Sequence, residues 1–240
     1  MSAACYVVTG ASSGIGAAVA ARLLARGEGV VAVARHADAL ERLYGQNPNA
    51  LCVAADLELP DATARVSAAL RERFGSVRGF VHCAGFAAPA PLGLVQDATA
   101  HRLFAVHALF PMQFLGWMAK RQNHVDGAAA VLVSSIACHE GDAGNVAYAS
   151  AKGAVEGMLK AAAAELAQRG VRVNAIAPGL VDTEMARNGQ VKDFSRATTP
   201  VQIAEVIEFF LDERSSCVNG QCLVADGGPM PLVREGRLTH

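Results

Sequence analysis

The chain has 240 residues, of which 52% are hydrophobic and only 18% are charged, a composition that excludes a predominantly disordered protein. Its 21 Lys and Arg residues nearly balance its 22 Asp and Glu residues, so no basic excess is present to bind nucleic acid or an anionic membrane. The longest apolar stretch, Gly127 to Cys138, is too short to span a bilayer, and the first residues lack the charged segment of a signal peptide.

Seven short apolar runs alternate with helical segments along the chain. The predicted strands are Cys5–Thr9, Gly29–Ala34, Ala50–Ala55, Gly79–Cys83, Ala128–Ser134, Val171–Ala177 and Gln221–Ala225. The predicted helices include Ile15–Arg26, Ala62–Phe74, Ala100–Arg121, Tyr148–Arg169 and Val201–Asp212. Nearly continuous apolar strands are typical of parallel sheets covered on both faces. We therefore predict a single α/β domain over residues 1–230, a doubly wound parallel sheet of the Rossmann type with about seven strands and helices on both faces, and a polar tail over 231–240.

A glycine-rich segment connects the first predicted strand to the first predicted helix, with the sequence Thr9-Gly10-Ala11-Ser12-Ser13-Gly14-Ile15-Gly16. Gly10 permits a tight turn, Gly14 allows the backbone to approach a pyrophosphate, and Gly16 allows helix and strand to pack closely. The helix N-terminus then offers unpaired N–H groups and a positive dipole end to phosphate groups. No Lys follows in the manner of a P-loop, so the pattern favours a dinucleotide site; the alternative is a tight turn that binds no ligand.

The residues at the end of the second predicted strand indicate which dinucleotide binds. An NAD site usually has Asp or Glu here, which accepts a hydrogen bond from the ribose 2′-OH. This chain has Ala34 at that position, followed by Arg35. Loss of the carboxylate removes repulsion toward a 2′-phosphate, and an arginine pairs with that group bidentately. We therefore predict a preference for NADP(H) over NAD(H); the alternative is that Arg35 is only a solvated surface charge.

A tyrosine and a lysine four residues apart begin a later predicted helix. This spacing places Tyr148 and Lys152 on one helical face, where an ammonium group lowers the pKa of a neighbouring phenol. Ser135 ends the preceding apolar strand, at the edge where open α/β sheets bind ligands. The Tyr–Lys spacing alone is common by chance, but in combination with Ser135 and the glycine loop it predicts a catalytic site.

Together these motifs resemble the short-chain dehydrogenase/reductase family, in its compact subgroup, over nearly the whole chain. Further segments share the likeness: Asp56-Leu57, Cys83-Ala84-Gly85, Asn174, Pro178-Gly179, Thr183, Asn219-Gly220-Gln221 and Asp226-Gly227-Gly228. The resemblance implies an NADPH-dependent carbonyl reductase. In such an enzyme Tyr148 donates a proton to the substrate oxygen, Ser135 hydrogen-bonds that oxygen, and Lys152 holds the nicotinamide ribose and lowers the pKa of Tyr148.

The resemblance also implies which residues hold the cofactor. Asp56 and the Leu57 backbone would bind adenine, and four residues around the sixth strand would fix the nicotinamide carboxamide. The full set of predicted cofactor-binding residues is Gly10, Ser12, Ser13, Gly14, Ile15, Gly16, Arg35, Asp56, Leu57, Cys83, Ala84, Gly85, Tyr148, Lys152, Pro178, Gly179, Val181 and Thr183. The predicted catalytic residues are Ser135, Tyr148, Lys152 and His107, and no metal ligand is predicted.

Three segments depart from the family pattern. His82-Cys83 replaces two Asn residues that usually brace the sheet, so we expect cofactor binding to survive. His107 stands where the family has an Asn that helps hold a water relay to the active-site Lys. We expect its ring near Lys152, with a lowered pKa and with activity declining as the ring is protonated at low pH; the alternative is a satisfied core histidine. The segment Thr183–Pro200 is shorter than the usual substrate lid, which indicates an open pocket for a bulky or carrier-bound substrate.

Several alternatives stay open for the substrate and the partners. The nearest family likeness is to reductases of 3-oxoacyl thioesters on acyl carrier protein or CoA. The alternatives are a dehydrogenase or ketoreductase for a polyol, sugar or polycyclic metabolite, and a nucleotide-binding regulator without turnover. The family resemblance also implies a homodimer or homotetramer, formed through the long helices and near the final strand.

The cysteines indicate the cellular compartment. The chain has six, and no two form a C-x-x-C pair: Cys5, Cys52, Cys83, Cys138, Cys217 and Cys222. Four lie in apolar runs, so we predict buried reduced thiols rather than disulfides or a zinc site. This usage is typical of the reducing cytoplasm.

Overall fold

Seven parallel strands form the central sheet of the protein, whose computed structural model describes residues 4–188 and 193–227. The strands lie in the order β3-β2-β1-β4-β5-β6-β7, and every neighbouring pair is parallel. Their bounds are β1 Cys5–Thr9, β2 Gly29–Ala34, β3 Ala50–Ala54, β4 Val77–His82, β5 His124–Val133, β6 Arg172–Pro178 and β7 Cys222–Ala225. The predicted doubly wound parallel sheet is confirmed.

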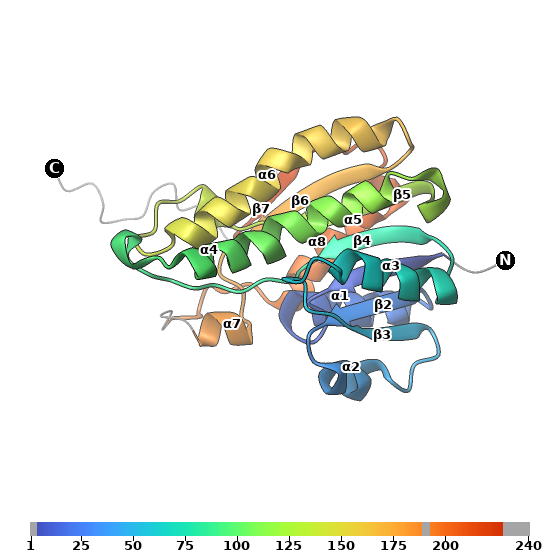
Figure 1. The fold of residues 1–240 in the computed structure, drawn as a ribbon, viewed down its shortest axis with the longest axis horizontal. Helices are drawn as coiled ribbons and strands as arrows, with labels where there is room; N and C mark the ends of the chain where they lie inside the picture. Colours follow the sequence, from blue (N-terminus) through green and yellow to red (C-terminus); the bar gives the residue numbers. More distant parts are fainter. Residues whose placement is uncertain (1–3, 189–192, 228–240) are drawn as a thin grey trace.

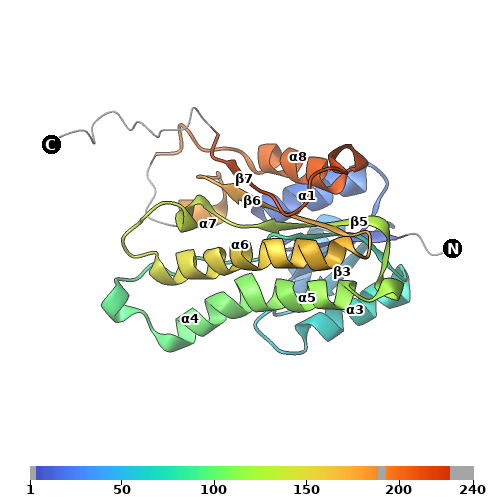
Figure 2. The ribbon, with the colours of Figure 1, turned by 90° about the horizontal axis from the view of Figure 1, so that it is seen from above.

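Helices cover both faces of this sheet (Figure 1). Their bounds are α1 Gly14–Ala25, α2 Ala37–Tyr44, α3 Ala62–Arg73, α4 Asp97–Phe104, α5 Phe110–Met118, α6 Val146–Ala167, α7 Glu184–Arg187 and α8 Pro200–Leu211. Seen from above, α1 and α8 lie together on one side of the sheet, and α3, α5 and α6 lie on the other (Figure 2). The inner strands are therefore shielded from water on both sides, whereas the edge strands β3 and β7 are only partly covered.

The two faces of the sheet belong to two separate hydrophobic cores. In β1, Val7 packs into the core of α3, α5 and α6, whereas the next residue, Val8, packs into the core of α1 and α8. Both side chains are completely buried. Because successive side chains of a strand point to opposite faces, a strand covered on both faces needs an apolar residue at every position. This requirement explains the continuous apolar runs of the sequence.

Several strand ends differ from the prediction, as in β5, which begins at His124 rather than at Ala128, and two helical segments differ more. Helix α2 was not predicted, because it is short and buries only Leu40 and Tyr44. The predicted helix Ala100–Arg121 is instead α4, a π-helical turn over Ala105–Leu109 and α5. The predicted tail over 231–240 lies outside the described residues. Within the described ranges, no helix combines the length and apolar character needed to cross a membrane.

The expectation of buried thiols is only partly confirmed. All six cysteines are free, but only Cys5 is fully buried. Cys217 is exposed, and the other four are half-buried. Strand residues near the ends of the sheet are only partly covered by helices, so an apolar run in the sequence does not guarantee a buried thiol.

Candidate active site

A cavity of about 1320 Å³ opens at the carboxyl ends of the strands. The strand order reverses between β1 and β4, and such a switch point leaves a crevice in which open α/β sheets bind ligands. The cavity wall includes every residue predicted from the sequence to bind the cofactor or to act in catalysis. Tertiary structure thus brings together segments from residue 10 to residue 183.

The glycine loop forms one end of this cavity, and its glycine positions have no room for a side chain. Gly10 and Gly14 have positive φ angles of 68° and 54°. A Cβ on Gly10 would lie 2.8 Å from the Ala84 amide nitrogen, and one on Gly16 would collide with the Gly10 carbonyl oxygen. Both contacts are shorter than atoms tolerate, so the turn and the close helix–strand packing require glycine. This bare backbone at the start of α1 fits a dinucleotide pyrophosphate.

The adenine end of the cavity is built from the ends of β2 and β3. Arg35 follows β2 directly, is exposed and lines the cavity. The Asp56 carboxylate accepts a hydrogen bond from the Glu58 backbone at 3.0 Å, and Leu57 is buried beside it. The Glu58 carboxylate is itself paired with Arg102 at 2.8 Å. Glu58 is thus paired with Arg102, and Arg35 lines the cavity as an exposed guanidinium.

Three side chains meet further along the cavity: Ser135, Tyr148 and Lys152. The Lys152 ammonium is buried and donates a hydrogen bond to the Val133 carbonyl at 2.7 Å. Its nitrogen lies 5.8 Å from the centre of the Tyr148 ring, one helical turn away on α6. The Ser135 hydroxyl, which accepts from the Ala137 amide at 3.2 Å, hydrogen-bonds the Tyr148 phenol. The predicted spacing therefore does place the pair on one helical face.

Burial controls the protonation of these groups. It lowers the pKa of Lys152 to about 8, because a charged ammonium is costly away from water. It also raises the pKa of Tyr148, and the hydrogen bond with Ser135 offsets only part of that rise. The expected lowering of the Tyr148 pKa by Lys152 is not found, because burial outweighs it and the ammonium donates to a backbone carbonyl. At neutral pH Tyr148 is therefore protonated and able to act as an acid.

Comparison with known proteins identifies the family that shares this site. A model of the short chain dehydrogenase family matches residues 4–193. The chain belongs to this family. The match spans both the glycine loop and the Tyr148–Lys152 pair. The protein is therefore an NAD(P)-dependent oxidoreductase that acts on CH–OH or C=O groups.

Individual short-chain dehydrogenases resemble the whole chain. Cis-4-hydroxycyclohexanecarboxylate dehydrogenase of Sinomonas cyclohexanicum is 36% identical over 236 residues, covering 92% of this chain and 94% of that protein. A 3-oxoacyl-[acyl-carrier-protein] reductase of Vibrio cholerae is 30% identical, with 92% and 95% covered. The crystal structure of a 3-ketoacyl-(acyl-carrier-protein) reductase from Brucella melitensis, complexed with NADH, superposes with a TM-score of 0.85 at 27% identity, covering 94% and 97% of the two chains.

His82 braces the sheet of this short-chain dehydrogenase, as expected for the residue that replaces an Asn. Its Nδ1 pairs with the Thr9 hydroxyl at 2.9 Å and its Nε2 with the Val106 carbonyl at 3.0 Å. The Thr9 hydroxyl oxygen also accepts from the Ala84 amide at 3.2 Å. A neutral ring satisfies all of these bonds when Nε2 carries the proton. Burial and the charge of Lys152 accordingly lower the pKa of His82 to about 3.

His107 lies in the π-helical turn, 1% exposed, with its ring edge-on to Tyr148 at 5.5 Å. Its Nε2 lies 2.9 Å from the Phe86 carbonyl oxygen and 3.3 Å from the Phe86 amide nitrogen, which donates to it. Its Nδ1 is buried with no hydrogen-bond partner among the described residues. Burial and Lys152 lower the pKa of His107 to about 2. Protonation of His107, and the decline of activity expected from it, would therefore occur only at a pH below the range of an activity assay.

The other predicted cofactor residues lie at the far wall of the cavity. A Cβ on Gly179 would lie 2.8 Å from the Asp226 Cα, so this position too requires glycine. Val181 pairs with Thr198 across the base of the short lid segment. Thr183 caps α7, where its hydroxyl accepts from the Ala186 amide at 3.3 Å. Part of the lid, residues 189–192, lies outside the described residues.

Sequence reasoning missed two parts of the site. The π-helical turn carries His107 into the cavity, and such turns often occur at functional sites. Phe86 packs against the His107 ring and also lines the cavity. Neither has a local sequence signal, except that Phe86 directly follows the Ala84-Gly85 motif.

Proposed function

We propose that the protein is an NADPH-dependent carbonyl reductase built from one domain over residues 1–230 and working in the reducing cytoplasm. The observation that carries this proposal is one cavity lined by the bare glycine loop and by Ser135, Tyr148 and Lys152. The glycine loop would hold the pyrophosphate, and the three polar side chains would handle the substrate oxygen and its proton.

The proposed chemistry reduces a ketone to a secondary alcohol. When bound, NADPH supplies the hydride that goes to the carbonyl carbon. The Ser135 hydroxyl orients the substrate oxygen by a hydrogen bond, and Tyr148 gives its phenolic proton to that oxygen. Lys152, still largely protonated at neutral pH with a pKa of about 8, stabilises the phenolate left behind. His107 is proposed to stay neutral, with its unpartnered Nδ1 in the ring that lies edge-on to Tyr148.

The residues at the mouth of the cavity favour the binding of an uncharged, largely apolar substrate. Leu92 and Met185 line it and are 70% and 48% exposed. Among the described lining residues outside the adenine end, Asp142 and Lys152 are the charged ones, and Lys152 is buried. The described lining residues thus offer no free cation there to a substrate carboxylate. We therefore place 3-oxoacyl thioesters first, the substrate class named for the Vibrio cholerae relative, and uncharged cyclic ketones second. The Sinomonas cyclohexanicum relative is named for a ring substrate that carries a carboxylate.

A panel assay tests the proposal. NADPH oxidation is followed with acetoacetyl thioesters, diketones and cyclic ketones, and we expect turnover with at least the thioesters. Turnover of cyclic ketones alone would favour the second substrate class. If NADPH binds tightly but no member of the panel is reduced, the proposed reduction of these ketones fails, and a nucleotide-binding role without turnover is favoured.

Replacing Arg35 should remove most of the cofactor preference. An arginine–phosphate pair contributes about 2–3 kcal/mol, so Arg35→Ala should weaken NADPH binding by roughly 30- to 150-fold and leave NADH binding nearly unchanged. Dissociation constants for both cofactors, measured by fluorescence titration, check this. Arg42→Ala, an exposed arginine on α2 that does not line the cavity, is the matched control. Equal binding of the two cofactors by the unmodified protein would contradict the predicted preference.

The surface of α5 and α6 supports a homodimer or homotetramer. Met112 on α5 is 50% exposed, and a Cβ on Gly116 or Gly157 would meet no atom within 4 Å. On the last strand, Leu223 and Val224 are 45% and 39% exposed, which supports a second interface. Light scattering at micromolar concentration should give a multiple of the chain mass. The Met112→Glu variant should have a lower measured mass. A monomer mass for the unmodified protein would refute the assembly.

A further inference from the structure

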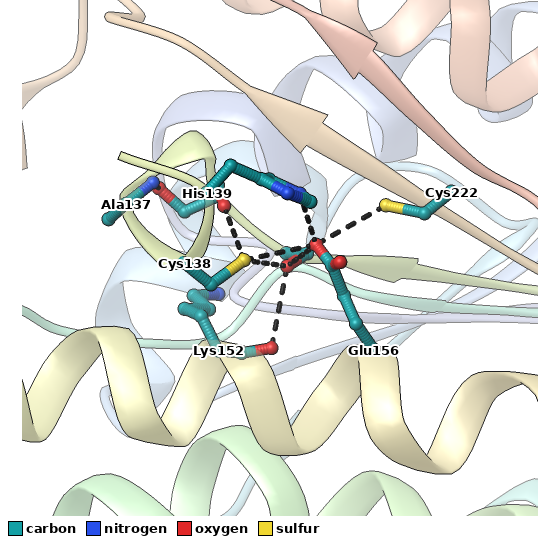
Figure 3. Close-up of polar contacts among 8 residues, drawn as sticks. Ala137, Cys138, His139, Lys152, Glu156 and Cys222 are labelled. Atoms are coloured by element: carbon teal, nitrogen blue, oxygen red, sulfur yellow. Dashed lines mark hydrogen bonds and ion pairs between the residues drawn. The ribbon is translucent and has the colours of Figure 1, made fainter. Parts of the chain in front are cut away.

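Four hydrogen-bond donors converge on one carboxylate oxygen of Glu156, on α6 one helical turn beyond Lys152 (Figure 3). The Ser134 hydroxyl lies 2.7 Å from Glu156 Oε1 and the His139 Nε2 lies 3.0 Å from it. The Cys138 and Cys222 thiols lie 3.1 Å and 3.4 Å from the same oxygen. These residues come from the end of β5, the turn after Ser135, α6 and β7, so four separate segments meet at one atom.

The cluster holds more donors than this oxygen can accept. A carboxylate oxygen has two lone pairs, yet two thiols, an imidazole and a hydroxyl surround it. The cluster is also accessible, since the His139 side chain is 44% exposed and Glu156 20%. None of Cys138, His139, Glu156 and Cys222 lines the cavity or takes part in the reaction described above.

The types of donor match one class of metal ion. Thiolate sulfur, imidazole nitrogen and carboxylate oxygen are the zinc ligands of proteins, whereas Mg²⁺ and Ca²⁺ require oxygen ligands. The ligand atoms of Cys138, His139 and Glu156 all lie within 4.8 Å of one another. Zinc bonds of about 2.0–2.3 Å place the corners of a tetrahedron roughly 3.3–3.8 Å apart. Small side-chain movements therefore bring the three atoms to one ion. The Cys222 thiol, 3.4 Å from Glu156 Oε1, lies outside this group of three and needs a larger movement to become the fourth ligand.

We propose that Cys138, His139, Glu156 and Cys222 form a zinc-binding site. On binding, the two thiols release their protons to solvent, the imidazole coordinates through an unprotonated ring nitrogen, and the carboxylate exchanges its hydrogen bonds for the ion. No electron is transferred. The site would tie the turn after Ser135 to α6 and to the last strand. Cys138 Sγ, which lies 2.9 Å from the Ser135 carbonyl oxygen, would link the metal to the backbone of that residue.

The sequence analysis predicted no metal site because no two cysteines form a short-spaced pair. In this cluster, Cys138 and His139 are adjacent in the sequence. Glu156 comes later, on α6, and Cys222 lies on the last strand, β7. Only the packing of α6 against the sheet brings the four together. The proposal does not depend on the identity of the substrate or on turnover.

Metal titration of the full chain tests the site directly. The protein is kept reduced with a reductant that does not bind metals, and Zn²⁺ binding is measured by competition with a chromophoric chelator. Co²⁺ is used as a spectroscopic substitute. We expect one tight site per chain, thiolate-to-cobalt absorption in the near ultraviolet, proton release on binding and no effect of Mg²⁺. His139→Ala and Cys222→Ser should each weaken Zn²⁺ binding at least about 100-fold, since even indirect partners of a ligand are worth 10- to 100-fold.

Matched variants outside the cluster are the controls. Cys217→Ser removes an exposed thiol and His101→Ala an exposed imidazole, and neither should change Zn²⁺ affinity. His139 is the first variant to examine because its exposed side chain contributes little to folding, which circular dichroism verifies. Equal Zn²⁺ affinities in the cluster and control variants, or a Co²⁺ complex without thiolate absorption, would overturn the proposal.

Discussion

Tyr148→Phe should lower kcat for ketone reduction by at least about 100-fold, the low end for loss of a positioned acid. The phenol is the acidic group that hydrogen-bonds Ser135 and lies beside Lys152, and burial keeps it protonated at neutral pH. Because the ring remains, NADPH affinity should barely change. Steady-state kinetics and a fluorescence titration of NADPH measure the two quantities separately.

A second tyrosine provides the control for this variant. Tyr6 is buried in β1, in the core of α1 and α8, and its hydroxyl does not line the cavity. Tyr6→Phe makes the same chemical change and should leave kcat near its original value. The assignment of Tyr148 as the acid is wrong if Tyr148→Phe turns over as fast as Tyr6→Phe.

The free energy of unfolding should be lower by about 4 kcal/mol at pH 5 than at pH 7, because two histidines are buried in neutral form. The folded-state pKa values of His82 and His107 are lowered to about 3 and about 2, whereas an unfolded histidine has a pKa near 6.5. Between these limits the unfolded chain binds protons that the folded chain does not. Stability is therefore complete above about pH 6.5 and is lost as the pH falls.

Urea unfolding at several pH values measures this loss. The window from pH 5 to pH 7 isolates the histidines, since the carboxylates with lowered pKa values, such as Glu58 and Asp182, titrate below it. His82→Asn and His107→Asn should each remove about half of the pH dependence. His101→Asn, at an exposed histidine, should leave it intact. A free energy of unfolding that is the same at pH 5 and pH 7 would show that neither ring is held neutral by the fold.

Local patterns in the sequence were sufficient to predict the architecture and most of the site. Continuous apolar runs predicted the seven strands, since each strand face is covered by helices. The glycine spacing predicted the cofactor turn, because side chains at Gly10 and Gly16 would collide with backbone. The spacing of Tyr148 and Lys152 placed them on one face of α6, since residues four apart on a helix are neighbours. The contact of Gly16 with Gly10 and the spacing on α6 act within a few residues of the chain, whereas the contact of Gly10 is with Ala84.

Only the tertiary structure decided features that depend on contacts between distant segments. The raised pKa of Tyr148 follows from burial by several elements, which the Tyr–Lys spacing does not encode. The π-helical turn that carries His107 into the cavity preserves an ordinary helical pattern in the sequence. The cluster around Glu156 joins the end of β5, α6 and β7, and Glu156 and Cys222 alone are 66 residues apart. Desolvation and long-range packing arise only when the chain has folded. The sequence by itself therefore determined which residues occupy the strand ends, the glycine turn and the face of α6, and the fold determined the protonation and the partners of their side chains.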